Sequence, residues 1–81
     1  MDIRMLRLGD VLAKTGLSRT AMYDDAAVGL FTKPVKIGAR AAAWPAHEVD
    51  AVLRARLSGK SNEQLRALVR SLHAARIDDD L

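Results

Sequence analysis

The sequence contains no cysteine, two prolines and only three aromatic residues among its 81 positions. Without cysteine the chain has neither a disulfide framework nor a thiolate metal site, which fits a reducing cytoplasm. No apolar run reaches the roughly 18 residues that a membrane helix needs, and the N-terminus lacks the apolar segment of a signal peptide. We therefore expect a cytoplasmic protein that does not enter a membrane.

Groups suited to catalysis or metal binding are also scarce. His47 and His73 are the only histidines, and neither is spaced beside a plausible nucleophile. Two histidines without cysteine make a weak metal signal, and both read more simply as exposed helix residues. A chain of this length forms one domain at most and buries only about 60% of its unfolded surface, which leaves little room for a deep pocket. We expect a non-enzymatic protein with no catalytic residue, no metal and no cofactor.

Positive charge is concentrated in the first half of the chain. Residues 1–41 hold seven Lys or Arg against four Asp or Glu, whereas residues 42–81 hold six of each. The net charge of +3 therefore arises entirely from the N-terminal half. This bias favours a polyanionic partner on that half, although a solvated basic face gives the same pattern.

A short strand or extended segment and then a short helix are predicted before Gly16. The stretch "RMLRL" alternates apolar and basic residues, which is typical of a strand. Three apolar residues then follow at i, i+3 and i+4, the spacing of a helix: Leu8, Val11 and Leu12. Gly16 suits the position after a helix end, where a left-handed backbone costs glycine little.

A second helix is predicted from about Arg19 to Val28. Ser18 is a preferred N-cap residue, and Leu17 with Met22 can form a hydrophobic staple across the cap. Gly29 ends the helix. Two helices joined by a three- to four-residue turn that contains glycine form the outline of a helix-turn-helix.

The two sides of this second helix differ in chemistry. At about 100° per residue, one side carries Ala21, Met22, Asp25 and Val28, and the other carries Arg19, Thr20, Tyr23 and Ala27, with Asp24 at its edge. Arginine can bind guanine, threonine a phosphate or a thymine methyl, and tyrosine the DNA backbone. The helix N-terminus also favours phosphate. An exposed Arg19–Tyr23 pair without a ligand would give the same pattern.

A β-hairpin is predicted after this helix, with strands at about 35–37 and 42–44 and a turn at Gly38–Ala41. The expected core residues in this region are Leu30, Phe31, Val35, Ile37 and Trp44. Lys36 would lie opposite the core and Arg40 at the tip of the turn. A helix-turn-helix followed by a basic hairpin is a winged helix, whose wing would carry Lys33, Lys36 and Arg40. Binding of DNA by such a surface should weaken steeply with salt.

Two further helices are predicted after Pro45, which suits a helix start. The first has the stripe Val49, Val52, Leu53 and Leu57, and Gly59 ends it. The second opens with Ser61 and Gln64 in capping-box spacing, and its stripe is Leu65, Leu68, Val69 and Leu72. The expected fold is mainly α with a small β-hairpin: a winged helix-turn-helix over residues 1–59, an additional helix over 60–77 and an acidic tail over 78–81. The additional helix either packs on the winged helix or mediates self-association.

The combined pattern over about residues 6–56 resembles the AlpA-type phage transcriptional regulators and the related excisionases, small winged-helix proteins of the MerR-like group. The matching pieces are "LAKTGLSR" with "MY", the hairpin segment "GLFTKPVKIGARAAAW" and the helix segment "EVDAVL". The resemblance implies a protein that binds double-stranded DNA and regulates transcription or directs excision of a phage or integrative element. Some such proteins act with a tyrosine integrase, and some assemble cooperatively on DNA, so a homo-oligomer stays open.

The resemblance also assigns residues to roles. Ser18, Arg19, Thr20 and Tyr23 match positions of the recognition helix, Lys33, Lys36 and Arg40 match the wing, and Trp44 and Val49 match the core. Relatives commonly have a basic residue in place of Asp24 and an apolar one in place of Asp25. Since an unpaired charge near the core would be costly, we expect Asp25 to reach a boundary or to pair with a basic residue such as Lys14, Lys33 or Arg40. The two carboxylates keep an alternative open: a protein-binding module that has lost DNA affinity and uses the Asp24–Asp25 face or the Leu65–Leu72 stripe.

Overall fold

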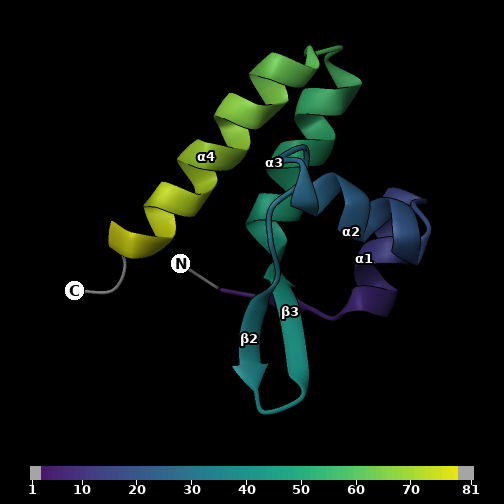
Figure 1. The fold of residues 1–81 in the computed structure, drawn as a ribbon, viewed down its shortest axis with the longest axis vertical. Helices are drawn as coiled ribbons and strands as arrows, with labels where there is room; N and C mark the ends of the chain where they lie inside the picture. Colours follow the sequence, from purple (N-terminus) through teal and green to yellow (C-terminus); the bar gives the residue numbers. More distant parts are fainter. Residues whose placement is uncertain (1–2, 79–81) are drawn as a thin grey trace.

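The computed structural model describes residues 3–78, which form four helices and one three-stranded sheet (Figure 1). In chain order the elements are β1 (Met5–Leu6), α1 (Leu8–Thr15), α2 (Arg19–Ala27), β2 (Val35–Gly38), β3 (Ala41–Pro45), α3 (Ala46–Leu57) and α4 (Asn62–Asp78). The predicted fold class is confirmed: two short helices, a hairpin and a following helix make a winged helix-turn-helix, and α4 is the additional C-terminal helix.

The sheet is antiparallel, with the strand order β1-β3-β2. β2 and β3 form the predicted hairpin, with Val35 opposite Ala43 and a bulge between Lys36 and Gly38. β1 adds a strand that the sequence analysis placed in no sheet, pairing Leu6 with Trp44. Because a two-stranded hairpin is only marginally stable by itself, this third strand helps to fix the base of the hairpin to the body.

The turn between α1 and α2 follows from three local interactions. Gly16 adopts the left-handed region with φ of 74°, and its N–H donates to the carbonyl of Leu12 at 2.8 Å. The hydroxyl of Ser18 accepts a hydrogen bond from the N–H of Ala21 at 3.1 Å, as predicted for an N-cap. Leu17 packs against the same core cluster that contains Met22. These interactions fix the start of α2 relative to α1.

Trp44 is at the centre of the core. Its side chain is fully buried together with those of Met22 from α2, Phe31 from the loop after α2 and Val49 from α3. The indole N–H donates to the carbonyl of Thr32 at 2.8 Å, so β3 is also joined to the segment that leads into β2. The core prediction is confirmed for Phe31 and Trp44, while Leu30 and Val35 are half-buried.

Three apolar residues predicted on inward faces are exposed instead. Ile37 is 48% exposed because it lies where the hairpin extends beyond the body and the β-bulge interrupts the alternation. Val28 is 53% exposed because α2 ends one residue earlier, at Ala27, and Ala26 takes the buried position. Leu57 is 88% exposed because it is the last residue of α3, where the chain turns toward α4.

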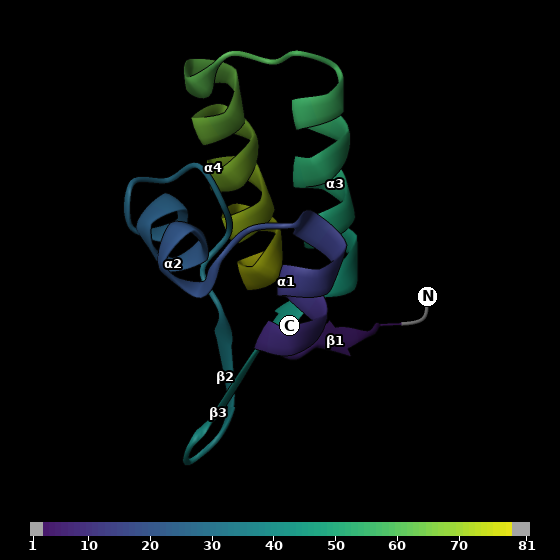
Figure 2. The same ribbon diagram turned by 90° about the vertical axis from the view of Figure 1, so that its right-hand side faces the viewer.

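α4 lies alongside α3 and returns toward the base of the hairpin (Figures 1 and 2). The predicted capping box is formed: the N–H of Ser61 donates to the side-chain oxygen of Gln64, whose N–H donates to the hydroxyl of Ser61. Leu65 and Val69 are buried, and Leu68 and Leu72 are half-buried against the core. The stripe of α4 therefore packs on the winged helix. Of the predicted acidic tail, residues 79–81 lie outside the described residues.

Candidate nucleic-acid interface

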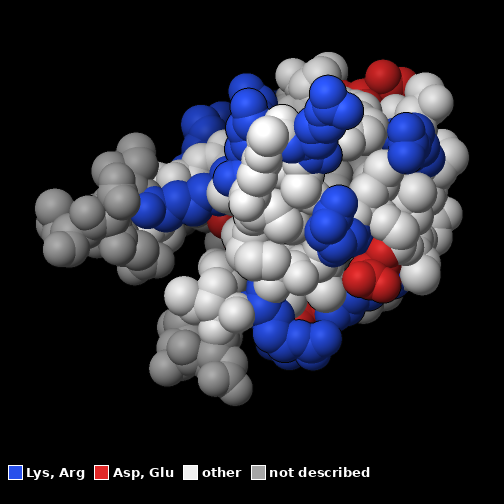
Figure 3. Space-filling view, turned by 90° about the horizontal axis from the view of Figure 1, so that it is seen from below, with Lys and Arg blue, Asp and Glu red and all other residues white. Residues whose placement is uncertain are grey.

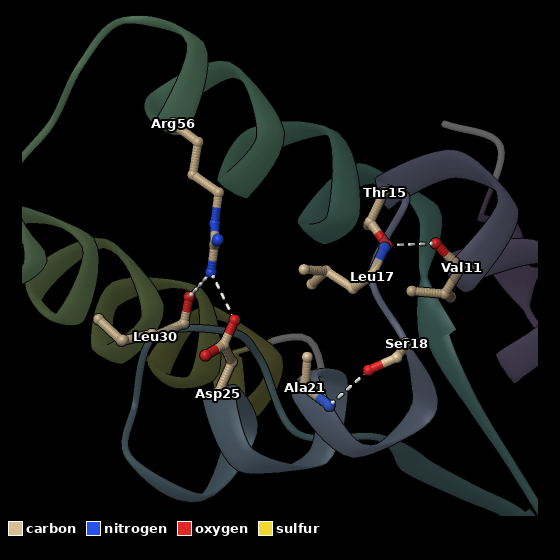
Figure 4. Close-up of polar contacts among 8 residues, drawn as sticks. All are labelled: Val11, Thr15, Leu17, Ser18, Ala21, Asp25, Leu30 and Arg56. Atoms are coloured by element: carbon tan, nitrogen blue, oxygen red, sulfur yellow. Dashed lines mark hydrogen bonds and ion pairs between the residues drawn. The ribbon is translucent and has the colours of Figure 1, made fainter.

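The first turn of α2 presents three of the predicted recognition residues to solvent. Ser18, Arg19 and Thr20 are all exposed, and no acidic residue lies in that turn. The hydroxyl of Ser18 is engaged in the N-cap, as Figure 4 shows. Arg19 and Thr20 thus lie at the positive end of the helix dipole, which attracts phosphate.

Tyr23 has one side against the core and one side in solvent. Its ring packs edge-on against the indole of Trp44, with the ring centroids 6.1 Å apart and an interplanar angle of 60°. The residue is nevertheless 43% exposed. The core therefore holds the ring in one orientation while part of it stays accessible to a ligand.

The hairpin extends from the body beside α2 (Figures 1 and 2). Its predicted cations Lys33, Lys36 and Arg40 are exposed, Arg40 in the turn between β2 and β3. Tyr23 of α2 and Lys33 before β2 line the same shallow groove, whose other walls include Ala27 and Pro34. The structure thus places Tyr23, one of the four predicted recognition residues, next to the base of the hairpin, whereas Ser18, Arg19 and Thr20 do not line this groove. Seen from the hairpin end, this face carries many lysine and arginine side chains (Figure 3).

The groove continues from α2 onto α4. Its extension is lined by Val28, Lys33, Arg66, Arg70 and His73 among others, and none of its described lining residues is acidic. Arg66 and Arg70 are not among the DNA-binding residues predicted from the sequence, where both lie off the apolar stripe of their helix. Only the packing of α4 against α2 brings them next to Lys33.

Three arginines hold the segment 28–33, which links α2 to the hairpin, through its main-chain carbonyls. Arg56 of α3 donates to the carbonyl of Leu30 at 3.2 Å. From α4, Arg66 donates to the carbonyl of Val28 at 2.9 Å and Arg76 to that of Lys33 at 2.7 Å. We refer to Arg56, Arg66 and Arg76 as the linker clamp. It binds the segment from the α3–α4 side.

The linker clamp also explains how Asp25 is accommodated. The Asp25 carboxylate accepts a hydrogen bond from Arg56 at 3.0 Å, as Figure 4 shows, and is only 24% exposed. Asp25 therefore lies at a boundary and pairs with a basic residue, as predicted, but its partner is Arg56 and not Lys14, Lys33 or Arg40. Lys14 is instead 2.6 Å from Asp50, a hydrogen bond that lowers the pKa of that carboxyl, and Lys33 and Arg40 belong to the hairpin side. Asp25 thus joins α2 to α3, whereas Asp24 is exposed.

The base of the hairpin holds a buried charge. Glu48, at the start of α3, is fully buried, and both of its carboxylate oxygens accept hydrogen bonds from Arg76. The imidazole Nε2 of His73 accepts a hydrogen bond from the N–H of Lys33 at 3.1 Å. The interpretation of His73 as an exposed helix residue is therefore wrong, since it is half-buried and bonded.

The stability of the protein should depend on the protonation of His73. Burial lowers the pKa of His73 from its ordinary value of 6.5, and the charges of Arg76 and Lys33 lower it further against the opposing effect of Glu48. The unfolded chain therefore binds the proton more readily, so the free energy of unfolding rises with pH in this window. We expect the stabilisation by neutral His73 to be complete above pH of about 6.5 and lost as the pH falls through the lower folded-state pKa.

Urea unfolding of the wild type and of His73→Gln between pH 7.5 and 5 measures this effect. Glutamine can accept the same N–H but does not titrate, and the exposed His47 is present in both proteins. The variant should lose less stability on acidification. An identical loss in both proteins would contradict the role given to His73.

Among the described side chains, those of residues 3–76, no group of three or more His, Cys, Asp or Glu could hold a metal ion. No helix within residues 3–78 is long and apolar enough to cross a membrane. Residues 4–57 match the family model described as "Prophage CP4-57 regulatory protein (AlpA)". No curated protein and no solved structure matches the chain significantly. The matched residues span β1 to α3, and α4 lies outside them.

Proposed function

We propose that this chain, which belongs to the AlpA family of prophage regulatory proteins, binds double-stranded DNA in a sequence-specific manner through α2 and the hairpin. The observation that carries the proposal is the shared groove of Tyr23 and Lys33, which joins the exposed side of α2 to the base of a basic hairpin. A helix paired with an adjacent wing is a geometry that lets a small domain contact a major groove and the neighbouring backbone together.

In this proposal the first turns of α2 enter the major groove. Arg19 is the candidate for a bidentate contact with guanine, and Thr20 for a phosphate or a thymine methyl. Tyr23, oriented by Trp44, would contact the DNA backbone. Ser18 acts through its cap, which takes up the N–H of Ala21 and fixes the start of α2, where the helix N-terminus would face phosphate.

The cations around α2 supply sequence-independent affinity. Lys36 and Arg40 on the hairpin and Lys33 at its base would neutralise phosphates, each with release of counterions. Arg70 on α4 extends this set along the groove. Its contact would lie on a part of the backbone beyond the reach of the hairpin.

Within this proposal, control of transcription and control of excision use the same contacts with DNA. A recognition site in the promoter of a neighbouring gene would make the protein a transcriptional regulator. A site beside an attachment sequence would make it an excisionase, with a tyrosine integrase as its partner. Either activity would be exerted in the cytoplasm, where the DNA is, and either can involve self-association on DNA.

Selection of duplexes from a random pool, followed by mobility-shift titration, tests the proposal. We expect a defined sequence to be enriched, and Arg19→Ala to lose about 1–3 kcal/mol on it with a smaller loss on random duplex. Arg54→Ala is the matched control, because Arg54 is exposed in a separate hollow beside His47 and Asp50.

Two results would count against the proposal. Equal losses on selected and random duplex would make Arg19 a phosphate contact rather than a reader of bases. No binding to any duplex at low salt would favour the alternative, a protein-binding module on the same scaffold.

A further inference from the structure

We propose that Arg76 is a positioning residue for the hairpin, and that α4 thereby sets the direction in which the wing meets DNA. The inference rests on the proposed DNA-binding function for its consequence, but its structural part can be tested without DNA. It assigns a role in recognition to a helix that lies outside the residues matched by the family.

Lys33 is the point at which the chain enters the hairpin, two residues before β2 begins at Val35. Side chains of α4 bind both of its main-chain polar groups. The N–H of Lys33 donates to Nε2 of His73 at 3.1 Å, and its carbonyl accepts from Arg76 at 2.7 Å. Pro34 follows and restricts the backbone of Lys33 to extended conformations. The chain is therefore fixed where it enters β2, the first strand of the hairpin.

Arg76 also binds the chain just after β3, the second strand of the hairpin. Its guanidinium donates to both carboxylate oxygens of Glu48, which lies three residues after Pro45, the end of β3. Glu48 is fully buried, so its position is set by the core. One planar group thus joins Lys33, two residues before β2, to the first turn of α3, which follows β3. Arginine is suited to this because its fork donates several hydrogen bonds in fixed directions.

Because the hairpin is long, a small rotation at its base produces a large displacement at its tip. At about 3.3 Å per residue, Arg40 lies up to about 23 Å along the chain from Lys33. A rotation of about 10° at the base would move the tip by up to about 4 Å, more than a hydrogen bond tolerates. The wing can therefore hold its phosphate contacts only if its base is fixed.

Amide hydrogen exchange on the free full-length protein separates positioning from general stabilisation. We expect Arg76→Gln to accelerate exchange in β2 and β3 by about tenfold or more, since it removes charged hydrogen bonds from the base of the hairpin. Amides of α1 should exchange as in the wild type. Lys60→Gln is the control for the loss of one exposed positive charge.

A second variant covers the case in which Arg76→Gln fails to fold because Glu48 is left unpaired. Arg76→Lys keeps a positive charge near Glu48 but has no planar fork to reach Glu48 and the carbonyl of Lys33 together. It should fold and still accelerate exchange selectively in the hairpin. Equal acceleration in the hairpin and in α1, or no change in either variant, would overturn the proposal.

DNA titration then tests the consequence for recognition. If Arg76 acts through the wing, Arg40→Ala should weaken binding much less in the Arg76→Lys background than in the wild type, because the tip contact is already impaired. Additive losses would overturn the positioning role in recognition. Absence of DNA binding by the wild type would refute the proposed function alone, since the exchange result is measured without DNA.

Discussion

Replacement of Trp44 by alanine is expected to cost about 3–5 kcal/mol of stability, a large part of the roughly 5–15 kcal/mol available to a domain. The indole is fully buried, packs against Tyr23 and donates to the carbonyl of Thr32. Its removal leaves a cavity and an unpaired carbonyl at the point where β3, α2 and the loop before the hairpin meet. We expect the free energy of unfolding and the urea midpoint to fall accordingly, as measured by far-ultraviolet circular dichroism during urea titration.

Trp44→Phe is the matched variant for this experiment. It keeps a ring in the core but removes the N–H that binds Thr32, so its loss should be about 1–3 kcal/mol. Circular dichroism suits the comparison because Trp44 is the only tryptophan and both variants lack its fluorescence. One hydrogen bond contributes about 1 kcal/mol. If Trp44→Ala lost no more than about 1 kcal/mol of unfolding free energy, the core would not be organised around this residue.

Reversal of the two charges on the hairpin should have the largest effect on DNA binding. Lys36→Glu combined with Arg40→Glu replaces two exposed cations with anions at and near the tip of the wing. We expect affinity for duplex DNA to fall at least about a hundredfold at low salt, since each lost phosphate contact also loses its counterion release. The slope of log affinity against log salt should become shallower by about two units.

A second charge-reversed protein distinguishes contact from net charge. Arg54→Glu with Lys60→Glu makes the same change in net charge at exposed positions of α3 and the turn that follows it. Its affinity should fall far less, and its salt slope should stay close to that of the wild type. If both doubly reversed proteins behave alike, the hairpin does not contact DNA and only the overall field of the protein attracts the duplex.

The features predicted from the sequence are those fixed by neighbouring residues. The cap at Ser18, the left-handed Gly16 and the capping box of Ser61 and Gln64 each depend on groups within about one helical turn, and all are present. The hairpin followed from Pro34 and the alternation around Lys36. Phe31 and Trp44, two of the core candidates predicted for the hairpin region, are both fully buried.

The features that the sequence did not reveal depend on contacts between distant segments. Arg56 and Asp25 are 31 positions apart, and Arg76 and Glu48 are 28 apart. Taken alone, Glu48, Arg56 and Arg76 have the pattern of solvated charges on a helix. Asp25 is predicted to lie near the core, but only the packing of α3 identifies Arg56 as its partner. The roles of Arg19, Thr20, Tyr23 and the wing cations in binding DNA stay predictions, which the experiments above test.

The linker clamp has a consequence for redesign of this protein. Arg56, Arg66 and Arg76 donate to main-chain carbonyl oxygens, which every amino acid has. These hydrogen bonds to residues 28–33 therefore do not depend on the side chains of that segment. Nor does the clamp occupy the outward positions at the start of α2. We therefore expect that substitutions at positions 19, 20 and 23 can change the preferred DNA sequence without changing the fold. Position 23 should keep an aromatic residue to preserve the packing on Trp44.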